Sequence, residues 1–320
     1  MTDRFDRGRF NVESPKVFWP VHLEPKTPEP DPLIIMTAPV GGVIIREQNP
    51  NQPYSAEEIT AQVKQAYDAG AQIHHFHVRD EMGFGSERME DYYRLYDTFT
   101  KECPGMLVSL NLTRPLDNDS IEERFDTHDL SLGDTVIINL GSMNVGPKVF
   151  INSEHFIVEG CRYLEERGVK PELAVYNQRM LSDLRELLIE PGIITPPYFI
   201  NMCMGIHSAI PATIPNLLSM LELMPEDATW LVSVGGRNWL PMLSAVIALG
   251  GHVRVGMEDN VYYYPHSDEK IDNGATPVKK MVQIAEALGR PIATIEQTAQ
   301  LLGLPQLKKS ATVQIPKHQA

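Results

Sequence analysis

Eight short apolar runs recur from residue 33 onward, at intervals of roughly 20 to 40 residues. They are residues 33–40, 72–78, 106–112, 135–140, 172–176, 198–203, 229–234 and 252–257. Because the runs are nearly unbroken, they predict strands of a parallel sheet that is buried on both faces. Amphipathic segments lie between them, and eight such units are the number that closes a (β/α)8 TIM barrel. The sequence therefore predicts this α/β fold. A doubly wound open sheet is the alternative if the strand count is off by one or two.

The segments between the runs carry helix start and stop signals. Ser55 stands at an N-cap position, Glu58 completes a capping box, and Gly70 lies where a C-terminal glycine belongs. Two more amphipathic segments after the eighth run predict C-terminal helices that follow the barrel. The predicted helices are residues 55–70, 155–168, 211–224, 239–251, 276–289 and 294–303.

Residues 1–32 show no clear periodicity and end in a proline-rich, charged stretch. They predict an irregular N-terminal arm, with a flexible tail as the alternative. The barrel is predicted to be a single catalytic domain of residues 33–303, followed by a C-terminal tail of residues 304–320. A chain of 320 residues has room for one barrel of about 250 residues with such extensions.

The composition restricts the partners and the compartment. A net charge of −14, with no cluster of Lys and Arg, argues against binding to nucleic acid or to an anionic membrane surface. The sequence has no apolar leader and no run of about 18 apolar residues, so neither secretion nor a membrane span is expected. Cys103, Cys161 and Cys203 lie far apart, which favours reduced, mostly buried thiols and a cytoplasmic location.

The second apolar run contains a pair of histidines at strand spacing. His75 and His77 are two residues apart, so on a strand both imidazoles project to the same face. They stand near the carboxyl end of the run, where barrel enzymes build their active sites. Two neighbouring imidazoles can supply two ligands to a divalent metal. A metal-free pair of histidines remains the alternative at this point.

The eighth run ends in two adjacent carboxylates, Glu258 and Asp259. In a closed barrel the eighth strand lies beside the first, and the second strand is next, so Glu258 can approach the two histidines. Two histidines and a glutamate with one open position are typical of catalytic zinc. On a regular strand the two carboxylates would face opposite ways unless a bend re-aims one of them. A pair of solvated loop acids is the alternative.

Further polar side chains stand at strand ends or inside the predicted barrel. Arg254 lies on the same strand face as Glu258 and points inward, so it needs an anionic partner. Asp259, Glu172 and a substrate carboxylate are candidates, and a structural ion pair is the alternative. Glu172 begins its strand, which is the end away from the expected site. Polar residues also follow the third and fourth strands, where ordinary solvation is an equally good interpretation; they are Asn111, Thr113, Ser142 and Asn144.

Six segments in the same order resemble the β-keto acid cleavage enzyme family over about residues 33–303. The specific feature is H-x-H-V-R-D combined with G-G-H-V-R-V-G-x-E-D-N. The segments are TAPVGG (37–42), NPNQPYSAEEI (49–59), AGAQIHHFHVRD (69–80), NLGSMN (139–144), GVKPELAVY (168–176) and GGHVRVGMEDN (250–260).

The resemblance implies a (β/α)8 barrel that forms a homotetramer and binds zinc through His75, His77 and Glu258. It implies an acyltransferase that exchanges acyl groups between a β-keto acid and acetyl-CoA, giving acetoacetate and a new acyl-CoA. Asp259 would be the general base, and Arg254 would pair with it. Polar groups after the fourth strand and a glutamate on the fifth would complete the site; these match Ser142, Asn144 and Glu172.

One position departs from the family pattern. In a member that acts on an ammonium-bearing substrate such as 3-keto-5-aminohexanoate, the resemblance implies an acidic side chain just after the first glycine turn. Here Val43 follows that turn, so we expect a different substrate side chain. Two other functions stay open: a metal-dependent aldol or Claisen-type lyase that needs no acetyl-CoA, and a non-catalytic metal-binding barrel.

Overall fold

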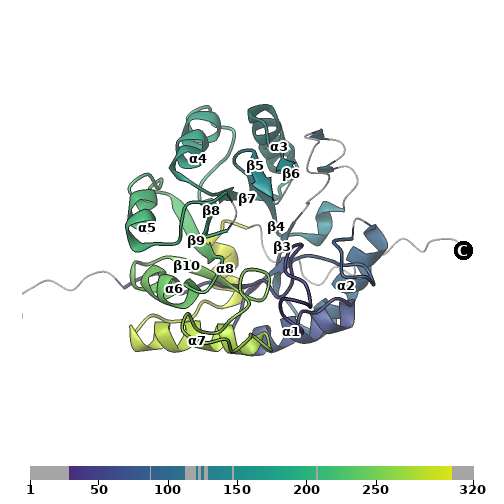
Figure 1. Ribbon diagram of the computed structural model, residues 1–320. Coiled ribbons are helices and arrows are strands. Elements are labelled where there is room, and N and C mark those ends of the chain that lie inside the picture. Colours follow the sequence, from purple (N-terminus) through teal and green to yellow (C-terminus); the bar gives the residue numbers. More distant parts are fainter. Residues whose placement is uncertain are drawn as a thin grey trace, which may run out of the picture. The chain divides into compact units, whose positions relative to one another are not determined.

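Eight parallel strands close into a barrel in the computed structural model (Figure 1). They follow the order β1-β10-β9-β8-β7-β4-β3-β2, so the last strand pairs with the first. The structure describes residues 29–86, 88–111, 120–121, 124–125, 129–145, 148–206 and 208–304. The strand bounds are β1 (Ile35–Thr37), β2 (Ile73–Phe76), β3 (Leu107–Leu110), β4 (Thr135–Asn139), β7 (Lys170–Val175), β8 (Tyr198–Met204), β9 (Ala228–Val234) and β10 (His252–Val255). Each strand falls on a predicted run, which confirms the barrel and excludes the open sheet.

The helices form a layer around the strands (Figure 1). Ser55 caps the first helix, and its capping box with Glu58 is present as predicted. Gly70 follows that helix with φ +109°, a left-handed backbone that suits glycine. The sequence signals did not single out α2 or α4. The helices are α1 (Ala56–Asp68), α2 (Met89–Glu102), α3 (Glu154–Glu166), α4 (Gln178–Asp183) with its π-helical continuation η5 (Leu184–Ile189), α5 (Ile214–Leu221), α6 (Trp239–Ala248), α7 (Ala275–Ala287) and α8 (Ile295–Leu301), besides the short 3-10 turn η4 (Leu130–Leu132).

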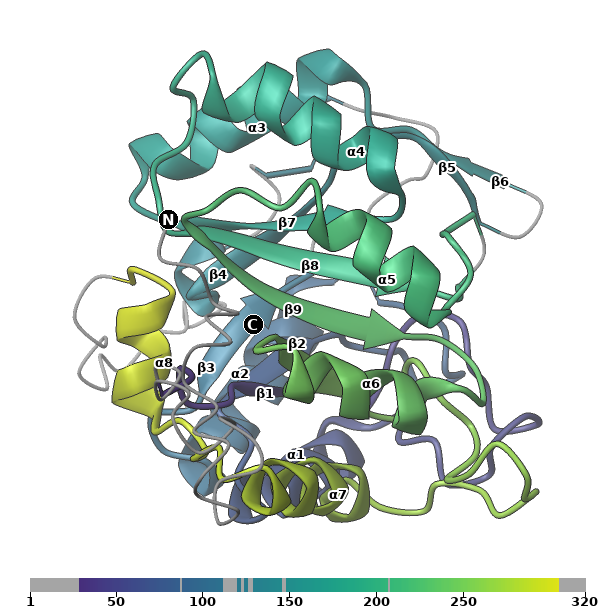
Figure 2. The same cartoon turned by 90° about the vertical axis from the view of Figure 1, so that its left-hand side faces the viewer.

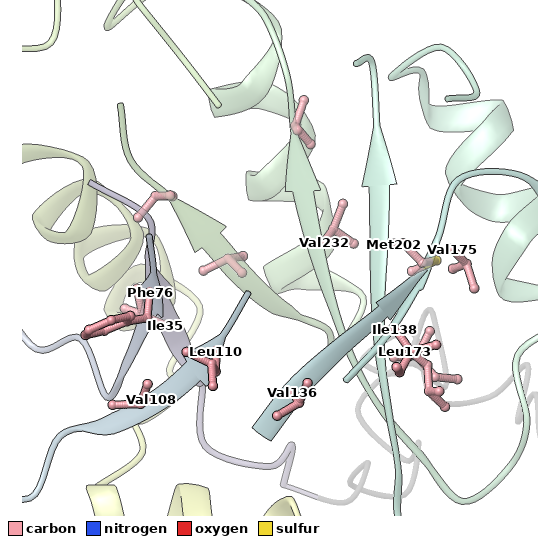
Figure 3. Close-up of a cluster of buried hydrophobic side chains, with 14 of the residues drawn as sticks. Ile35, Phe76, Val108, Leu110, Val136, Ile138, Leu173, Val175, Met202 and Val232 are labelled. Carbon is pink, nitrogen blue, oxygen red and sulfur yellow. The ribbon is translucent and has the colours of Figure 1, made fainter. Parts of the chain in front are cut away.

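Alternate strand residues build the main core between the strands and the helices. Figure 3 shows this set on several strands, including Phe76 on β2 and Val108 on β3. His74 has the same parity, and its ring lies 5.3 Å from that of Phe76 and 5.1 Å from that of Phe99. Burial lowers the pKa of His74 to about 3, so it is a neutral core residue. Its neighbour His75 therefore faces the barrel interior.

An apolar plug closes the end of the barrel at which the strands begin. Met36, Phe199 and Leu231 point inward there and pack with Ala299 and Leu302 near the end of α8. Figure 2 shows α8 at this end of the strands. The predicted C-terminal helices are therefore confirmed, and the second of them seals the interior.

A short antiparallel hairpin, β5 (Met143–Val145) and β6 (Lys148–Phe150), follows β4. It lies toward the carboxyl ends of the strands, opposite the end that α8 covers (Figure 2). Sequence analysis gave this stretch as a strand-end turn and did not predict the hairpin. Its three-residue strands are too short for a periodic signal.

The described chain bears on two of the compositional predictions. Cys103, Cys161 and Cys203 are free and buried, as predicted. Among the helices of the described ranges, none is both long and apolar enough to cross a bilayer.

Candidate active site

His75, His77 and Glu258 come together at the carboxyl end of the barrel. Nε2 of His75 lies 3.4 Å from Oε1 of Glu258, and Nε2 of His77 lies 3.6 Å from the same oxygen. One potential ligand atom from each residue fits within a 4.8 Å cluster. The strand order explains this proximity, because β1 pairs with β10 on one side and with β2 on the other. The structure thus brings the three predicted ligands together.

The hydrogen bonds around His75 leave a lone pair aimed at Glu258. Ser109 donates its hydroxyl hydrogen to Glu172 at 2.5 Å, so toward His75 it can only accept. In a neutral ring the proton would therefore lie on Nδ1 of His75, 3.2 Å away, and Nε2 would carry the lone pair. Neither Nε2 of His75 nor Oε2 of Glu258 has a hydrogen-bond partner, although both atoms are buried. Two unsatisfied acceptors side by side fit a bound cation.

His77 is neutral and has a competing partner. Burial lowers its pKa to about 3, so its ring keeps a free lone pair at neutral pH. Nδ2 of Asn111 lies 2.9 Å from Nε2 of His77. Ligation of a metal by this nitrogen and the hydrogen bond from Asn111 exclude each other. Asn111 is thus the predicted strand-end residue that contacts the cluster directly.

A glycine turn after β10 re-aims both carboxylates. The strand ends at Val255, and Gly256 has φ +153°, where an added Cβ would lie 2.0 Å from the Ala38 carbonyl oxygen. The backbone N–H of Glu258 donates to that same oxygen at 3.0 Å, which pins the turn to the end of β1. Only glycine fits this close approach. The bend that sequence analysis left open is therefore present.

Arg254 joins the two carboxylates. It donates to Asp259 from Nε at 2.9 Å and from Nη2 at 2.7 Å, and Nη2 also reaches Glu258 at 2.9 Å. Burial raises the pKa of Asp259 above its ordinary value, against the pull of Arg254. Burial also acts to raise the pKa of Glu258, but the neighbouring Arg254 brings it below its ordinary value. Glu258 is thus the weaker base of the pair, and Asp259 is the stronger base.

Glu172 lies beneath this cluster and is fully buried. The strand β7 begins at Lys170, two residues earlier than the predicted start, so Glu172 is inside the strand and not at its first position. It accepts hydrogen bonds from Ser109 at 2.5 Å and from Asn201 at 2.8 Å. Glu172 was a predicted partner of Arg254. In the structure it is connected to His75 instead, through the hydroxyl of Ser109.

A cavity of about 280 Å³ opens above the cluster. Its polar lining includes His75, Asn111, Arg254, Glu258 and Asp259, and the rest of the lining is largely apolar. Substrate could therefore reach the Arg254–Asp259 pair and the unsatisfied acceptors from one side.

The remaining predicted substrate-binding residues lie apart from the cavity lining or outside the described residues. The hydroxyl of Ser142 accepts from the N–H of Asn152 at 2.8 Å. Asn144 is exposed on β5, where its backbone pairs with the hydroxyl of Ser208. Thr113 lies outside the residues that the structure describes.

Sequence reasoning missed several inward polar groups. Ser109 orients His75, Asn201 holds Glu172, and the Tyr176 hydroxyl donates to Oδ1 of Asn139 at 2.6 Å at the cavity wall. A usable signal existed, because these residues share the strand parity of His75 and point inward by alternation. The predicted set came mostly from strand ends and from the family motifs, so Ser109 and Asn201, which lie farther down their strands, were missed.

A larger cleft of about 490 Å³ lies between the start of α1 and the segment that follows β2. Two of its arginines have acidic partners: Arg46 pairs with Glu58 at 2.7 Å, and Arg94 pairs with Glu57 at 2.7 Å. The smaller cavity holds the unsatisfied acceptors and the buried acid–arginine pair. Chemistry is therefore better supported there than in the larger cleft.

Comparison with known proteins places this geometry in context. A model of the beta-keto acid cleavage enzyme family matches residues 32–304. The chain is 34% identical over 275 residues to the 3-keto-5-aminohexanoate cleavage enzyme of Acetoanaerobium sticklandii, covering 85% of this chain and 98% of that protein. It is 28% identical over 281 residues to the 3-oxoadipate:acetyl-CoA acetyltransferase of Cupriavidus necator, covering 87% and 96%. Among solved structures, ObcA bound to oxaloacetate has the same fold, with a TM-score of 0.64 at 16% identity, covering 80% of this chain and 68% of ObcA.

Proposed function

The chain belongs to the beta-keto acid cleavage enzyme family, and we propose that it is an acyltransferase that cleaves a β-keto acid with acetyl-CoA. A β-keto acid R–CO–CH2–COO⁻ and acetyl-CoA exchange acyl groups, giving acetoacetate and R–CO–S-CoA. The observation that carries this proposal is the Arg254–Asp259 pair beside the unsatisfied acceptors of His75 and Glu258. The name of the relative from Cupriavidus necator, which pairs 3-oxoadipate with acetyl-CoA, supports the same cosubstrate.

The proposed metal is zinc, held by His75, His77 and Glu258. Two histidines and a glutamate form the ligand set of catalytic zinc sites that keep one position open. A bound divalent metal would act as a Lewis acid toward the keto and carboxylate oxygens of the substrate. Cobalt, manganese and nickel accept the same ligands, so elemental analysis of the purified protein identifies the metal.

Asp259 is the proposed general base. Its raised pKa makes it a better proton acceptor than an ordinary aspartate, and it stands on the cavity wall. It would take a proton from the carbon between the keto group and the carboxylate, and that carbon would then attack the acetyl thioester and release CoA thiolate. The thiolate would attack the R–CO group as the bond between this group and the same carbon breaks. The acetoacetate carbanion that leaves would take the proton back from Asp259. Arg254 holds both oxygens of Asp259 and so fixes its direction.

The supporting residues differ in whether they line the cavity. Glu172 would act through Ser109 on the orientation of His75, because it is buried and does not line the cavity. Asn111 lines the cavity and is the better-placed candidate for contact with substrate. The substrate-binding role remains a proposal for the others as well; they are Thr113, Ser142 and Asn144.

Domain limits, assembly and location are further proposals. The family match spans residues 32–304, which agrees with a barrel domain of residues 33–303 flanked by an arm and a tail. We propose a homotetramer because of the family resemblance, and a cytoplasmic location because free thiols suit a reducing compartment. Light scattering of the purified full chain measures the subunit number, and removal of residues 1–32 tests whether the arm contributes to it.

The test of function is acetoacetate formation from a panel of β-keto acids, with and without acetyl-CoA, followed by mass spectrometry. We expect acetoacetate only when acetyl-CoA is present. Asp259→Asn should lower kcat by about 10²–10⁴-fold, because the general base is lost while the shape is kept. The same variant should retain its metal, which separates loss of the base from loss of the site. Cleavage without acetyl-CoA would indicate the lyase, and a metal-loaded protein that turns over no acid would contradict the proposal.

A further inference from the structure

The cavity above the metal-ligand cluster has two chemically different parts. The cluster side is polar and comes from β2, β3 and the turn after β10. The other side comes from β4, the β5–β6 hairpin and the segment after β8, with a contribution from the segment after β1. Its apolar residues include Ile44, Ile137, Met143, Val145, Phe150 and Ile206. A substrate whose keto and carboxylate groups meet the cluster must direct its side chain toward this apolar part.

The charges in the described lining are used within the site. Arg254, Glu258 and Asp259 carry the full charges there, and Arg254 donates to both carboxylates. A charged group on the substrate side chain would lose its water against the apolar part, and the described lining offers it no unpaired opposite charge. Burial of an unpaired charge is strongly unfavourable, whereas burial of methylene groups is favourable.

One polar group on the apolar part is engaged within the wall as well. The Tyr176 hydroxyl donates to Asn139 at 2.6 Å, so its hydrogen is not available to a ligand. Burial also raises the pKa of Tyr176 well above its ordinary value, so the ring stays uncharged. With a volume of about 280 Å³, the cavity lies at the lower end of ligand pockets, which favours a short side chain.

We propose that the substrate is a β-keto acid whose side chain beyond the keto group is a short, uncharged alkyl group. This inference rests on the proposed acyl transfer and narrows its substrate class. It also separates the chain from its relatives, because the name of one relative specifies an amino side chain and that of another specifies a dicarboxylic acid.

Three six-carbon acids test the proposal: 3-oxohexanoate, 3-oxoadipate and 5-amino-3-oxohexanoate. All three give acetoacetate, so one assay on the zinc-loaded full chain compares them directly. We expect kcat/KM for 3-oxohexanoate to exceed that of both charged acids by at least about 100-fold. Along the neutral series, each added methylene should raise kcat/KM about fourfold until the cavity is full. Equal or higher kcat/KM with a charged acid would overturn the inference while leaving acyl transfer intact.

Binding separates this inference from the reaction. The corresponding 3-hydroxy acids have no keto group to cleave, and calorimetry measures their affinity for the zinc-loaded protein. The neutral 3-hydroxy acid should bind more tightly than either charged one, again by about 100-fold. If no keto acid is turned over, the acyl-transfer proposal fails, and the affinities still support or overturn the apolar preference by themselves.

Met143 offers a matched set of variants, since it lines the cavity and is only half-buried on β5. Met143→Lys should raise the use of 3-oxoadipate relative to 3-oxohexanoate by about fivefold, because it adds a counter-charge. Met143→Glu should raise the use of the amino-bearing keto acid relative to 3-oxohexanoate by a similar factor. Met143→Gln controls for polarity without charge. If all three variants shift the preference between charged and neutral keto acids in the same direction, the side chain of the substrate does not reach this wall and the inference fails.

Discussion

At the end of the barrel where the strands begin, Nδ1 of His252 accepts a hydrogen bond from the N–H of Ile34 at 3.0 Å. At the opposite end, Nε2 of His75 is equally buried and has no partner. Both histidines point into the barrel from strands near its closure. Burial alone therefore does not mark a metal ligand; an unsatisfied acceptor that also lies beside other potential ligand atoms does, as His75 lies beside His77 and Glu258.

The arginines of the two ends differ in the same way. Arg290 near the plug donates to main-chain oxygens, including those of Gly251 at 2.7 Å and Ile247 at 3.1 Å. Arg254 at the cavity donates to two carboxylates. Main-chain oxygens give Arg290 a fixed structural role. The carboxylates held by Arg254 can change partner or take a proton, so they can take part in chemistry.

The largest expected effect comes from comparing the loss of a histidine at the cavity with the loss of a histidine at the plugged end. His75→Ala should lower zinc affinity by more than about 100-fold and remove activity, because a ligand is lost and outer-shell losses already cost 10–100-fold. His252→Ala should keep its zinc but lower the free energy of unfolding by about 1–3 kcal/mol, because a buried N–H loses its acceptor. Zinc titration against a chelator and urea unfolding measure the two quantities. If both variants lost zinc equally, the contrast between the ends would be wrong.

Much of this architecture could be predicted from the sequence because it follows from repeated local signals. The eight apolar runs, the capping box of Ser55 and Glu58, and the C-terminal helices each need only a short window of residues. The approach of Glu258 to His75 and His77 also followed, because strand order in a closed barrel fixes which ends are neighbours.

What could not be predicted depends on contacts between distant segments. Strand starts shift by two residues without changing the apolar pattern, so Glu172 was assigned to the wrong part of its strand. The turn at Gly256 depends on a carbonyl oxygen of Ala38, over 200 positions earlier in the chain. The apolar character of the cavity required the side chains of several loops and strands to be placed in space.

The second effect tests how closely the cluster is packed. An added Cβ on Gly41 would lie 2.2 Å from Cγ of Glu258, whereas one on Gly42 would meet nothing within 4 Å. Gly41→Ala should therefore displace the Glu258 side chain and lower zinc affinity by about 10–100-fold, the usual result of disturbing a ligand's support. Gly42→Ala is the matched control and should bind zinc as the wild type does. Equal affinities for the two variants would show that Glu258 adapts freely.

The smallest expected effect, counted per pH unit, is a pH dependence of stability that comes from His252 at the plugged end. Burial, aided by the nearby Arg290, lowers the pKa of His252 to about 3, from an ordinary value of 6.5. Between these values the unfolded chain binds one more proton at His252 than the folded chain does. Stability therefore rises with pH in this window and is lost as the pH falls from 6.5, by up to about 1.4 kcal/mol per pH unit.

Replacing His252 with glutamine isolates this contribution, because the amide oxygen can still accept from Ile34 but cannot titrate. Urea unfolding of the metal-free protein at several pH values between 6.5 and 4 gives the slope for each protein. The plot of the free energy of unfolding against pH should be shallower for His252→Gln, by the equivalent of up to one proton. His74 contributes to the slope in both proteins, because burial lowers its pKa to about 3 as well. Identical slopes would mean that His252 takes up a proton in the folded chain, and the hydrogen bond from Ile34 would then not hold it neutral.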